Sequence, residues 1–194
     1  MVEKGSTILP IDYRELSRTV SHALRHSPAE YGLATDAQGW VTIGDLLAAL
    51  RGRKPEWQSL AEADLGEMIR RSDKARHQMD ESRIRAAYGH SSETKIQREP
   101  KLPPEVLFHG TDPAAVEIIR GSGLSPMARQ QVHLSADRET AELVGRRKAP
   151  APVILRIDAG RAHRSGISFY QGNDSVWLAD SVPPEFIFVD THGT

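Results

Sequence analysis

The chain has 194 residues, of which 39% are hydrophobic, enough for a packed core in one large domain or two small ones. Charged residues make up 26% and nearly cancel to a formal net charge of -1, which excludes global disorder and gives no overall signal for nucleic acid. The absence of cysteine excludes disulfides, thiolate metal sites and thiol nucleophiles. The sequence has neither a signal-peptide pattern nor an apolar run of about 20 residues, which predicts a cytoplasmic protein without a membrane span.

The first predicted element is an amphipathic helix that begins after Asp12 and is stopped by Ser27-Pro28. Its apolar positions recur at helical spacing and form one stripe, made of Leu16, Val20, Ala23 and Leu24. Basic residues gather on the opposite side, namely Arg14, Arg18, His22 and Arg25, and His26 follows at the helix end. Cations near a helix C-terminus also interact favourably with the helix dipole, so this charge alone does not identify a site.

The next predicted elements complete a small helical domain. A turn at residues 36–39 leads into a short strand at 40–43 and a helix through 46–50, for which Asp45 is a possible cap. A second cap-like residue, Ser59, precedes a helix that places Leu65, Met68 and Ile69 inward. Two strands within residues 75–88 are predicted to pair around Asp80-Glu81, so the pattern looks like a winged helix.

The clearest domain boundary is the polar stretch of residues 91–104, which contains three prolines and little periodicity. We predict two domains, residues 1–95 and 96–194. A short strand at residues 95–97 remains an alternative for part of the stretch.

Short apolar or alternating runs dominate the second half and predict strands at residues 106–108, 132–134, 153–157, 176–178 and 186–189. Two helices are expected near residues 114–120 and 139–147. The mixture predicts an α+β sheet domain rather than a doubly wound one, and no G-x-G-x-x-G motif is present.

Several side chains could carry chemistry, each with a structural alternative. In the His109-Gly110-Thr111 segment a histidine ends a predicted strand and glycine allows a ligand to approach closely, although a buried structural histidine fits as well. His133 points away from its two apolar neighbours and shares a face with Ser135. Arg129, ahead of that strand, suits either a phosphate or a surface ion pair. The eight histidines show no H-x-x-x-H or H-x-H spacing joined to a recognised carboxylate motif, so metal binding is not expected.

The order of several motifs resembles the RNA 2′-phosphotransferase family, from about Leu16 to Ile187. The segments are LSRTVSHALRHSPAEYGLATDAQGWVTIGDLLAAL, SDKARHQM, IRAAYGHS, LFHGT, GLSPMARQQVHLS, AELVGRR and NDSVWLADSVPPEFI. The resemblance implies an N-terminal winged-helix-like RNA-binding lobe and a C-terminal ADP-ribosyltransferase-like lobe that binds NAD.

Residue roles follow from the same resemblance. The implied catalytic residues are Arg25, His26, Arg76 and Arg129. The implied NAD-binding residues are His109, Gly110, Thr111, His133, Ser135 and Phe169, and the residues assigned to RNA are Arg85, Tyr88 and His90. The sequence departs from the family pattern at Ala87-Tyr88, where Asn-Gln is usual, at His77, where an aromatic residue is usual, and at Gln131, where histidine is common.

The implied reaction removes an internal 2′-phosphate from RNA, tRNA-like or other, with NAD as co-substrate and without a metal. An RNA-2′-phospho-ADP-ribose intermediate gives 2′-OH RNA, ADP-ribose 1″,2″-cyclic phosphate and nicotinamide, and a monomer is expected. Two alternatives remain at this point: ADP-ribosylation of terminal nucleic-acid phosphates or of a protein, and a non-catalytic RNA-binding protein that senses NAD.

Overall fold

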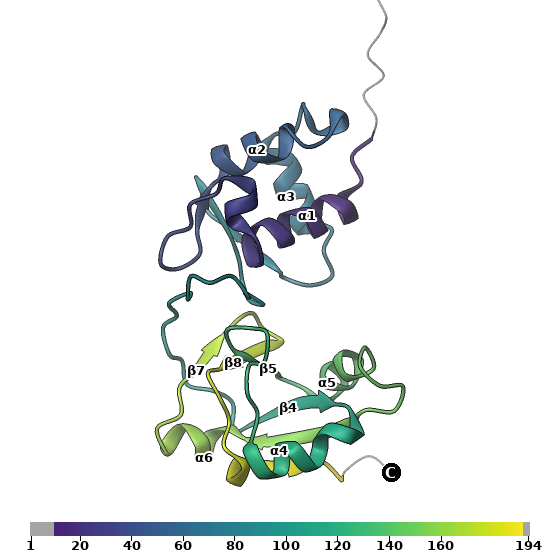
Figure 1. The fold of residues 1–194 in the computed structure, drawn as a ribbon, viewed down its shortest axis with the longest axis vertical. Coiled ribbons are helices and arrows are strands. Elements are labelled where there is room, and N and C mark those ends of the chain that lie inside the picture. Colours follow the sequence, from purple (N-terminus) through teal and green to yellow (C-terminus); the bar gives the residue numbers. More distant parts are fainter. Residues whose placement is uncertain (1–9, 192–194) are drawn as a thin grey trace, which may run out of the picture. The chain divides into compact units, whose positions relative to one another are not determined.

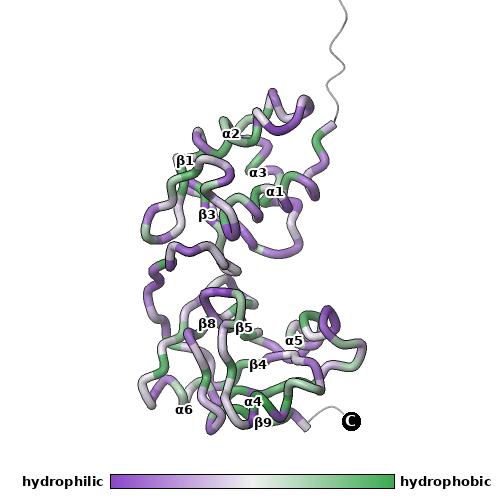
Figure 2. Tube along the Cα trace, viewed as in Figure 1, coloured by the Kyte–Doolittle hydropathy of each residue, from purple (hydrophilic) through white to green (hydrophobic). Residues whose placement is uncertain are grey.

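The computed structural model describes residues 10–191 and divides them into two compact units (Figure 1). Unit 1 runs to Ala87 and also contains Ser92–Thr94, whereas unit 2 contains Tyr88–Ser91 and the chain from Lys95 onward. Each unit has its own hydrophobic core. Figure 2 shows apolar stretches along the helices and strands of both units and a largely hydrophilic stretch at residues 91–101.

Unit 1 combines three α-helices with a small antiparallel sheet. The helices are α1 (Tyr13–Arg25), α2 (Ile43–Arg51) and α3 (Glu62–Arg70), with 3-10 turns η1 (Pro28–Tyr31) and η2 (Pro55–Trp57). The sheet has the order β1-β3-β2 and consists of β1 (Val41–Thr42), β2 (His77–Met79) and β3 (Arg83–Ala86). The predicted first helix and the predicted hairpin are therefore confirmed, with shorter strands than expected.

The first helix forms for the reasons that its sequence indicates. The Asp12 carboxylate accepts hydrogen bonds from the backbone N–H groups of Arg14 and Glu15, at 2.8 and 3.2 Å, which caps the helix start. The whole predicted apolar stripe is buried in the unit 1 core. Burial of this stripe leaves the basic side of α1 facing outward.

Two predicted helix caps are wrong. Thr42, not Asp45, caps α2, because the Thr42 backbone is extended and its hydroxyl oxygen accepts from the Asp45 N–H at 3.0 Å. The predicted strand at 40–43 is correspondingly shorter, since Ile43 already belongs to α2. At α3 the cap position is Ala61, whose N–H donates to the Asp64 carboxylate at 2.8 Å, so Ser59 lies outside the helix start.

Unit 2 is built on a six-stranded sheet with the order β7-β8-β5-β4-β6-β9, in which all neighbours are antiparallel. The strands are β4 (Val106–Thr111), β5 (Val132–Ser135), β6 (Val153–Asp158), β7 (Phe169–Gln171), β8 (Val176–Ala179) and β9 (Ile187–Val189). The helical segments are η3 (Pro113–Ala115), α4 (Val116–Ser122), α5 (Arg138–Gly145), α6 (Ala159–Arg164) and η4 (Pro184–Phe186). Helices and antiparallel sheets in both units confirm the predicted α+β class.

Sequence reasoning predicted five of these six strands and missed β7 and α6. Both missed elements are short, so neither contains enough residues for a clear periodicity. Residues 95–97 form no strand, and Phe186 lies in η4 ahead of β9.

Close packing between α5 and β4 fixes which side chains of β4 face the helix. A Cβ atom on Gly110 would lie 2.1 Å from the Ala141 carbonyl oxygen and 2.9 Å from the Gly145 Cα atom. Gly110 therefore lets the helix backbone approach the strand. Because side chains alternate along a strand, His109 and Thr111 point to the other side of β4.

Candidate active site

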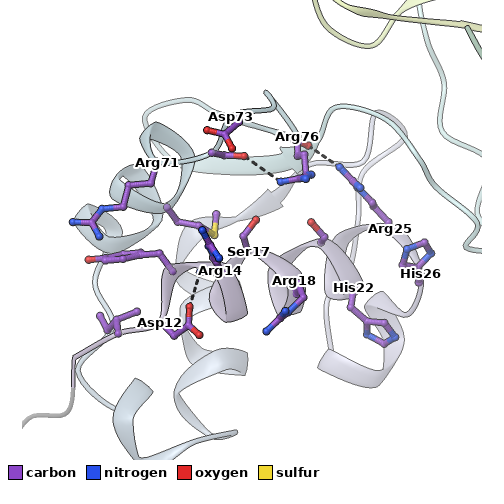
Figure 3. Close-up of a pocket in the computed structure, with 15 residues that line it drawn as sticks. Asp12, Arg14, Ser17, Arg18, His22, Arg25, His26, Arg71, Asp73 and Arg76 are labelled. Atoms are coloured by element: carbon purple, nitrogen blue, oxygen red, sulfur yellow. Dashed lines mark hydrogen bonds between the residues drawn. The ribbon is translucent and has the colours of Figure 1, made fainter. Parts of the chain in front are cut away.

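A pocket of about 920 Å³ lies beside α1 in unit 1 (Figure 3). Basic residues line it from α1 and from the loop that follows α3; they are Arg14, Arg18, His22, Arg25, His26, Arg71 and Arg76. Three of the residues that the family resemblance marks as catalytic, Arg25, His26 and Arg76, thus share one pocket. Two acidic residues, Asp12 and Asp73, also line it.

Hydrogen bonds to neutral oxygen atoms hold two of these guanidinium groups. Arg25 Nη2 donates to the Arg76 carbonyl oxygen at 3.3 Å, and Arg76 Nη1 donates to the Ser72 hydroxyl at 3.2 Å. The same hydroxyl donates to the Lys74 carbonyl oxygen at 2.7 Å, which fixes its orientation. Within residues 10–191, Arg76 forms no ion pair with a carboxylate, so its charge is available to an anion.

Ser72 is a positioning residue that sequence reasoning missed. The only available signal was a small hydroxyl residue in the loop between a helix and a strand, four positions before Arg76. Such residues usually satisfy local backbone groups, and only the folded loop brings this one to the guanidinium.

His77 lies buried next to this arginine pair and carries no charge. Burial first, and then the positive charges of Arg25 and Arg76, lower the pKa of His77 to about 3. Its Nε2 atom lies 3.1 Å from the Ser21 hydroxyl, so a hydrogen bond links β2 to α1 below the pocket. A neutral imidazole at this position leaves the positive charge of the pocket to the arginines.

Arg85, which was predicted to bind RNA, does not line this pocket. Its guanidinium donates to the Gln78 side-chain oxygen at 2.8 Å and to the Gln38 carbonyl oxygen at 3.3 Å, and stacks 4.4 Å from the Trp40 ring centre. The structure thus places Arg85 in a contact cluster on the β2–β3 hairpin, away from Arg25 and Arg76.

In unit 2, two predicted NAD-binding histidines are linked through the backbone of β5. Strand β4 pairs with β5 at one position, Phe108 with Ser135, whereas it pairs with β6 over six positions. Beyond that single pair, the His109 side chain bonds to β5, because its Nδ1 atom lies 2.9 Å from the His133 carbonyl oxygen. A side-chain donor thus stands where a backbone N–H group of β4 would donate in a regular sheet. His133 Nδ1 in turn lies 3.0 Å from the Gln131 carbonyl oxygen.

These contacts determine the tautomers of the two histidines. A carbonyl oxygen only accepts hydrogen bonds, so each Nδ1 atom must carry the proton. Burial lowers the pKa of His109, which favours the neutral ring. In that form the Nε2 atom of His109 is an acceptor, which is the complement of a sugar hydroxyl.

Tyr88 packs with these residues, because its ring meets the His133 ring edge-on with centroids 6.0 Å apart. Tyr88 was predicted to bind RNA and His133 to bind NAD, so the structure brings two separately assigned residues together. His90, the other RNA candidate in this segment, is buried, with only 2% of its surface exposed. A direct contact between its side chain and RNA would require this segment to move.

The loop of Arg129 is tied to the segment around His90 by its neighbour Gln130. The Gln130 N–H donates to the His90 carbonyl oxygen at 2.9 Å, and its side-chain oxygen accepts from the Ile96 N–H at 2.9 Å. Arg129 itself is exposed. Sequence reasoning missed Gln130, whose role depends on a partner 34 residues away.

The remaining predicted NAD-binding residues are mostly buried. Thr111 and Ser135 are 3% and 7% exposed, and Phe169 is fully enclosed in the unit 2 core. The Phe169 ring therefore has no surface for a cofactor in this structure. The backbone of α5 occupies the space that a Cβ atom on Gly110 would need. Helix packing therefore accounts for glycine at this position on that face, where we had predicted the close approach of a ligand.

Among residues 10–191, no group of three or more histidine, aspartate or glutamate side chains is arranged to hold a metal ion. Over the same part of the chain, no helix combines the length and apolar character needed to cross a membrane.

Comparison with known proteins gives one consistent result. The model of a family described as "RNA 2'-phosphotransferase, Tpt1 / KptA family" matches residues 12–181. A relative from Acetivibrio thermocellus is 51% identical over 177 residues, which are 91% of this chain and 97% of the relative. A relative from Bacillus thuringiensis is 49% identical over 92% of this chain and 96% of the relative. A relative from Agrobacterium fabrum is 44% identical over 89% of this chain and 92% of the relative. All three relatives carry the name "Probable RNA 2'-phosphotransferase".

Proposed function

The chain belongs to the RNA 2′-phosphotransferase, Tpt1 / KptA family, and on that premise we propose that it removes an internal 2′-phosphate from RNA with NAD as the acceptor. The observation that carries the proposal is the meeting of Arg25, His26 and Arg76 around one pocket, although Arg76 lies some fifty positions along the chain from the other two. The proposal places the reaction in the cytoplasm and in a single copy of the chain.

We assign the 2′-phosphate to the guanidinium groups of Arg25 and Arg76. A guanidinium presents planar paired donors that match two phosphate oxygens, and it stays charged at any physiological pH. Both groups are already held by neutral oxygens, so a bound phosphate would not have to displace a carboxylate from Arg76. Arg129, exposed in its loop, completes the proposed set of phosphate-binding arginines.

We assign the ribose of NAD to the histidines of β4 and β5. The residues present fit such a group, since backbone carbonyls use the Nδ1 protons of His109 and His133, and the Nε2 atom of the neutral His109 ring is an acceptor. NAD supplies a ribose carbon activated by a cationic leaving group. The protein's own contribution is to orient that ribose toward the phosphate.

The bond changes of the proposed reaction balance in two steps. A 2′-phosphate oxygen bonds to the anomeric carbon of the nicotinamide ribose as the bond to the nicotinamide nitrogen breaks, and that nitrogen loses its positive charge. The ribose O2″ then bonds to phosphorus and loses its proton to solvent water, while the bond from phosphorus to RNA O2′ breaks. In our proposal the arginines stabilise the charge on the phosphoryl oxygens and His26 gives a proton to RNA O2′.

The finer division of labour is part of the proposal. Unit 1, with three helices and a three-stranded antiparallel sheet, is compatible with a winged-helix-like RNA-binding lobe. Unit 2, whose antiparallel sheet loses its pairing between β4 and β5 after one position, is compatible with an ADP-ribosyltransferase-like lobe for NAD.

The test mixes the purified protein with NAD and an oligoribonucleotide that carries one internal 2′-phosphate. We expect RNA with a free 2′-hydroxyl, ADP-ribose 1″,2″-cyclic phosphate and nicotinamide in equal amounts. Folded protein that turns over none of the RNA would disprove the proposal. A stable ADP-ribosylated strand, formed from RNA with a terminal phosphate and without loss of the internal one, would assign the chain to ADP-ribosylation instead.

Arg129→Ala tests the residue assignment separately. Loss of one charged contact to the phosphate should cost about 2 to 4 kcal/mol in the transition state, or about 30- to 1000-fold in rate. We expect the RNA joined to ADP-ribose to accumulate in single-turnover assays. If the variant releases 2′-hydroxyl RNA as fast as the wild type, the assignment of Arg129 is wrong.

A further inference from the structure

The outward side of α1 carries a line of cations that continues beyond the proposed phosphate site. Arg14, Arg18 and His22 follow one another four residues apart, and the line ends at Arg25 and His26. We call Arg14, Arg18 and His22 the α1 row. Residues four apart lie on the same side of a helix, and Figure 3 shows these side chains along the same pocket as Arg25 and Arg76.

Within residues 10–191, the charges of Arg14 and Arg18 attract the Asp12 carboxylate at long range, but no direct polar contact holds either side chain. Arg14 and Arg18 are exposed, and neither side chain forms an ion pair or a hydrogen bond with another part of residues 10–191. Exposed arginines elsewhere pair with nearby glutamates, as Arg120 does with Glu117 at 2.8 Å and Arg146 with Glu142 at 2.6 Å. The α1 row therefore keeps arginine charge that no ion pair of the described chain neutralises.

The acidic residues of the pocket do not cancel this charge. The Asp12 carboxylate accepts two backbone N–H groups as the cap of α1, and it lies at the far end of the row from Arg25. Asp73 belongs to the loop opposite α1. Five arginines line the pocket against these two carboxylates: Arg14, Arg18, Arg25, Arg71 and Arg76. One of them, Arg71, is paired with Glu67 and stacks on Tyr13, which leaves four arginines facing two acids.

The distance from the start of the α1 row to the proposed phosphate site suits a nucleic-acid strand. At about 1.5 Å per residue, the twelve steps from Arg14 to His26 span about 18 Å along the helix axis. That distance is the length of about five stacked nucleotides at about 3.4 Å each. Basic residues four positions apart lie about 6 Å apart along the axis, so they meet about every second phosphate of a strand that rises about 3.4 Å per nucleotide.

From this geometry we infer that the α1 row binds the backbone phosphates of the RNA on one side of the reactive 2′-phosphate, with Arg18 and Arg14 as successive contacts. The inference rests on the proposed function, because it takes the pocket end at Arg25 and Arg76 as the place of the 2′-phosphate. Contacts to phosphates carry no base information. The row therefore selects RNA by the length of the flanking strand and not by its sequence.

The experiment compares two substrates that differ only in flanking length. One is a dinucleotide with a single internal 2′-phosphate, and the other is a decamer with the same step at its centre. The test variant is R14Q/R18Q. The matched control, R120Q/R146Q, removes the same charge from exposed arginines of unit 2.

We expect R14Q/R18Q to lower kcat/KM for the decamer about five- to tenfold through a higher KM, the size of two exposed charge contacts. The dinucleotide and the control variant should react as before. Binding of a decamer without a 2′-phosphate gives a second readout. The slope of the logarithm of the binding constant against the logarithm of the salt concentration should become shallower by about 1.4 in R14Q/R18Q. Each lost contact to a phosphate of a single strand accounts for about 0.7.

Each failure has its own signature. If wild-type protein turns over neither substrate with NAD, the proposed function fails, and the salt dependence of binding still tests the row. If wild-type protein is active but R14Q/R18Q matches the control on the decamer and in the salt slope, the row does not bind RNA. An equal loss on dinucleotide and decamer would also overturn the inference, since it would place these arginines in the chemical step.

Discussion

At the scale of single residues, a buried histidine stays neutral beside the arginines of the proposed phosphate pocket. His77 is buried beside two guanidinium groups, and its pKa of about 3 lies well below that of a histidine in an unfolded chain. In the unfolded chain, His77 binds a proton once the pH falls below about 6.5. In the folded protein, His77 binds this proton only near pH 3. The free energy of unfolding is therefore unaffected by the titration of His77 above about pH 6.5, and it decreases as the pH falls from about 6.5 to about 3.

His77→Gln tests this dependence, because glutamine does not titrate and retains a polar group near Ser21. We expect the wild type to lose about 2 kcal/mol more unfolding free energy than the variant between pH 7 and pH 5. Urea unfolding at the two pH values measures the difference. Equal losses in the two proteins would mean that His77 titrates normally in the folded state.

A second prediction at this scale concerns the acceptor nitrogen of His109. Removing it in His109→Ala takes away one hydrogen bond to the proposed NAD ribose, worth about 1 to 2 kcal/mol. We expect the KM for NAD to rise about five- to thirtyfold while the KM for RNA stays the same. His163→Ala is the control, since His163 lies on α6, outside the pair formed by His109 and His133. A change confined to the KM for RNA would contradict the assignment.

At the scale of elements, packing of α5 on β4 fixes the face of the strand that carries His109 and Thr111, two of the proposed NAD-binding residues. A Cβ atom on Gly110 would meet the backbone of α5 at Ala141 and Gly145, and one on Gly145 would meet the Pro152 side chain at 2.7 Å. The strand that carries His109 is thereby held against α5 on one face. A methyl group at Gly110 would meet helix backbone, which cannot move aside as a flexible side chain would.

Gly110→Ala should therefore destabilise unit 2 by about 1 to 3 kcal/mol, the usual cost of overpacking. Gly121→Ala is the matched control, because Gly121 lies in α4 with nothing within 4 Å of its added Cβ atom. In a helix that change is expected to be neutral or to stabilise by up to about 1 kcal/mol. Thermal unfolding of both variants measures the difference. Equal midpoint temperatures would show that α5 shifts to accommodate the methyl group without loss of stability.

The elements also show where local sequence is a reliable guide. The Asp12 cap, the apolar stripe of α1 and the β2–β3 hairpin depend on residues a few positions apart, and all were predictable. The choice of Thr42 over Asp45 as a cap was not, since both residues have suitable side chains. It depends on which backbone is extended, and β1 pairing with β3 decides that.

At the scale of the whole molecule, two separate cores let each half hold its own part of the proposed chemistry. Hydrogen exchange tests this division directly. NAD alone should slow exchange in β4 and β5, whereas adenosine 2′-phosphate alone should slow exchange at the end of α1 and around Arg76. If NAD protects α1 and leaves β4 and β5 unchanged, the assignment of the two units is reversed.

The sequence by itself determined the α+β class, most of the helices and strands, and the family, because these depend on local periodicity and on the order of motifs along the chain. It also placed the basic residues of α1 on one side of a helix.

Only the tertiary structure decided that Ser72 supports Arg76, that Gln130 ties the Arg129 loop to Ile96, and that β4 separates from β5 at His109. The physical reason is that a hydrogen bond or a close packing contact depends on which distant groups are brought within about 3 Å, and a linear pattern does not contain that distance. The same reason explains Gly110, whose sequence context suggested a ligand and whose Cβ side faces the backbone of α5.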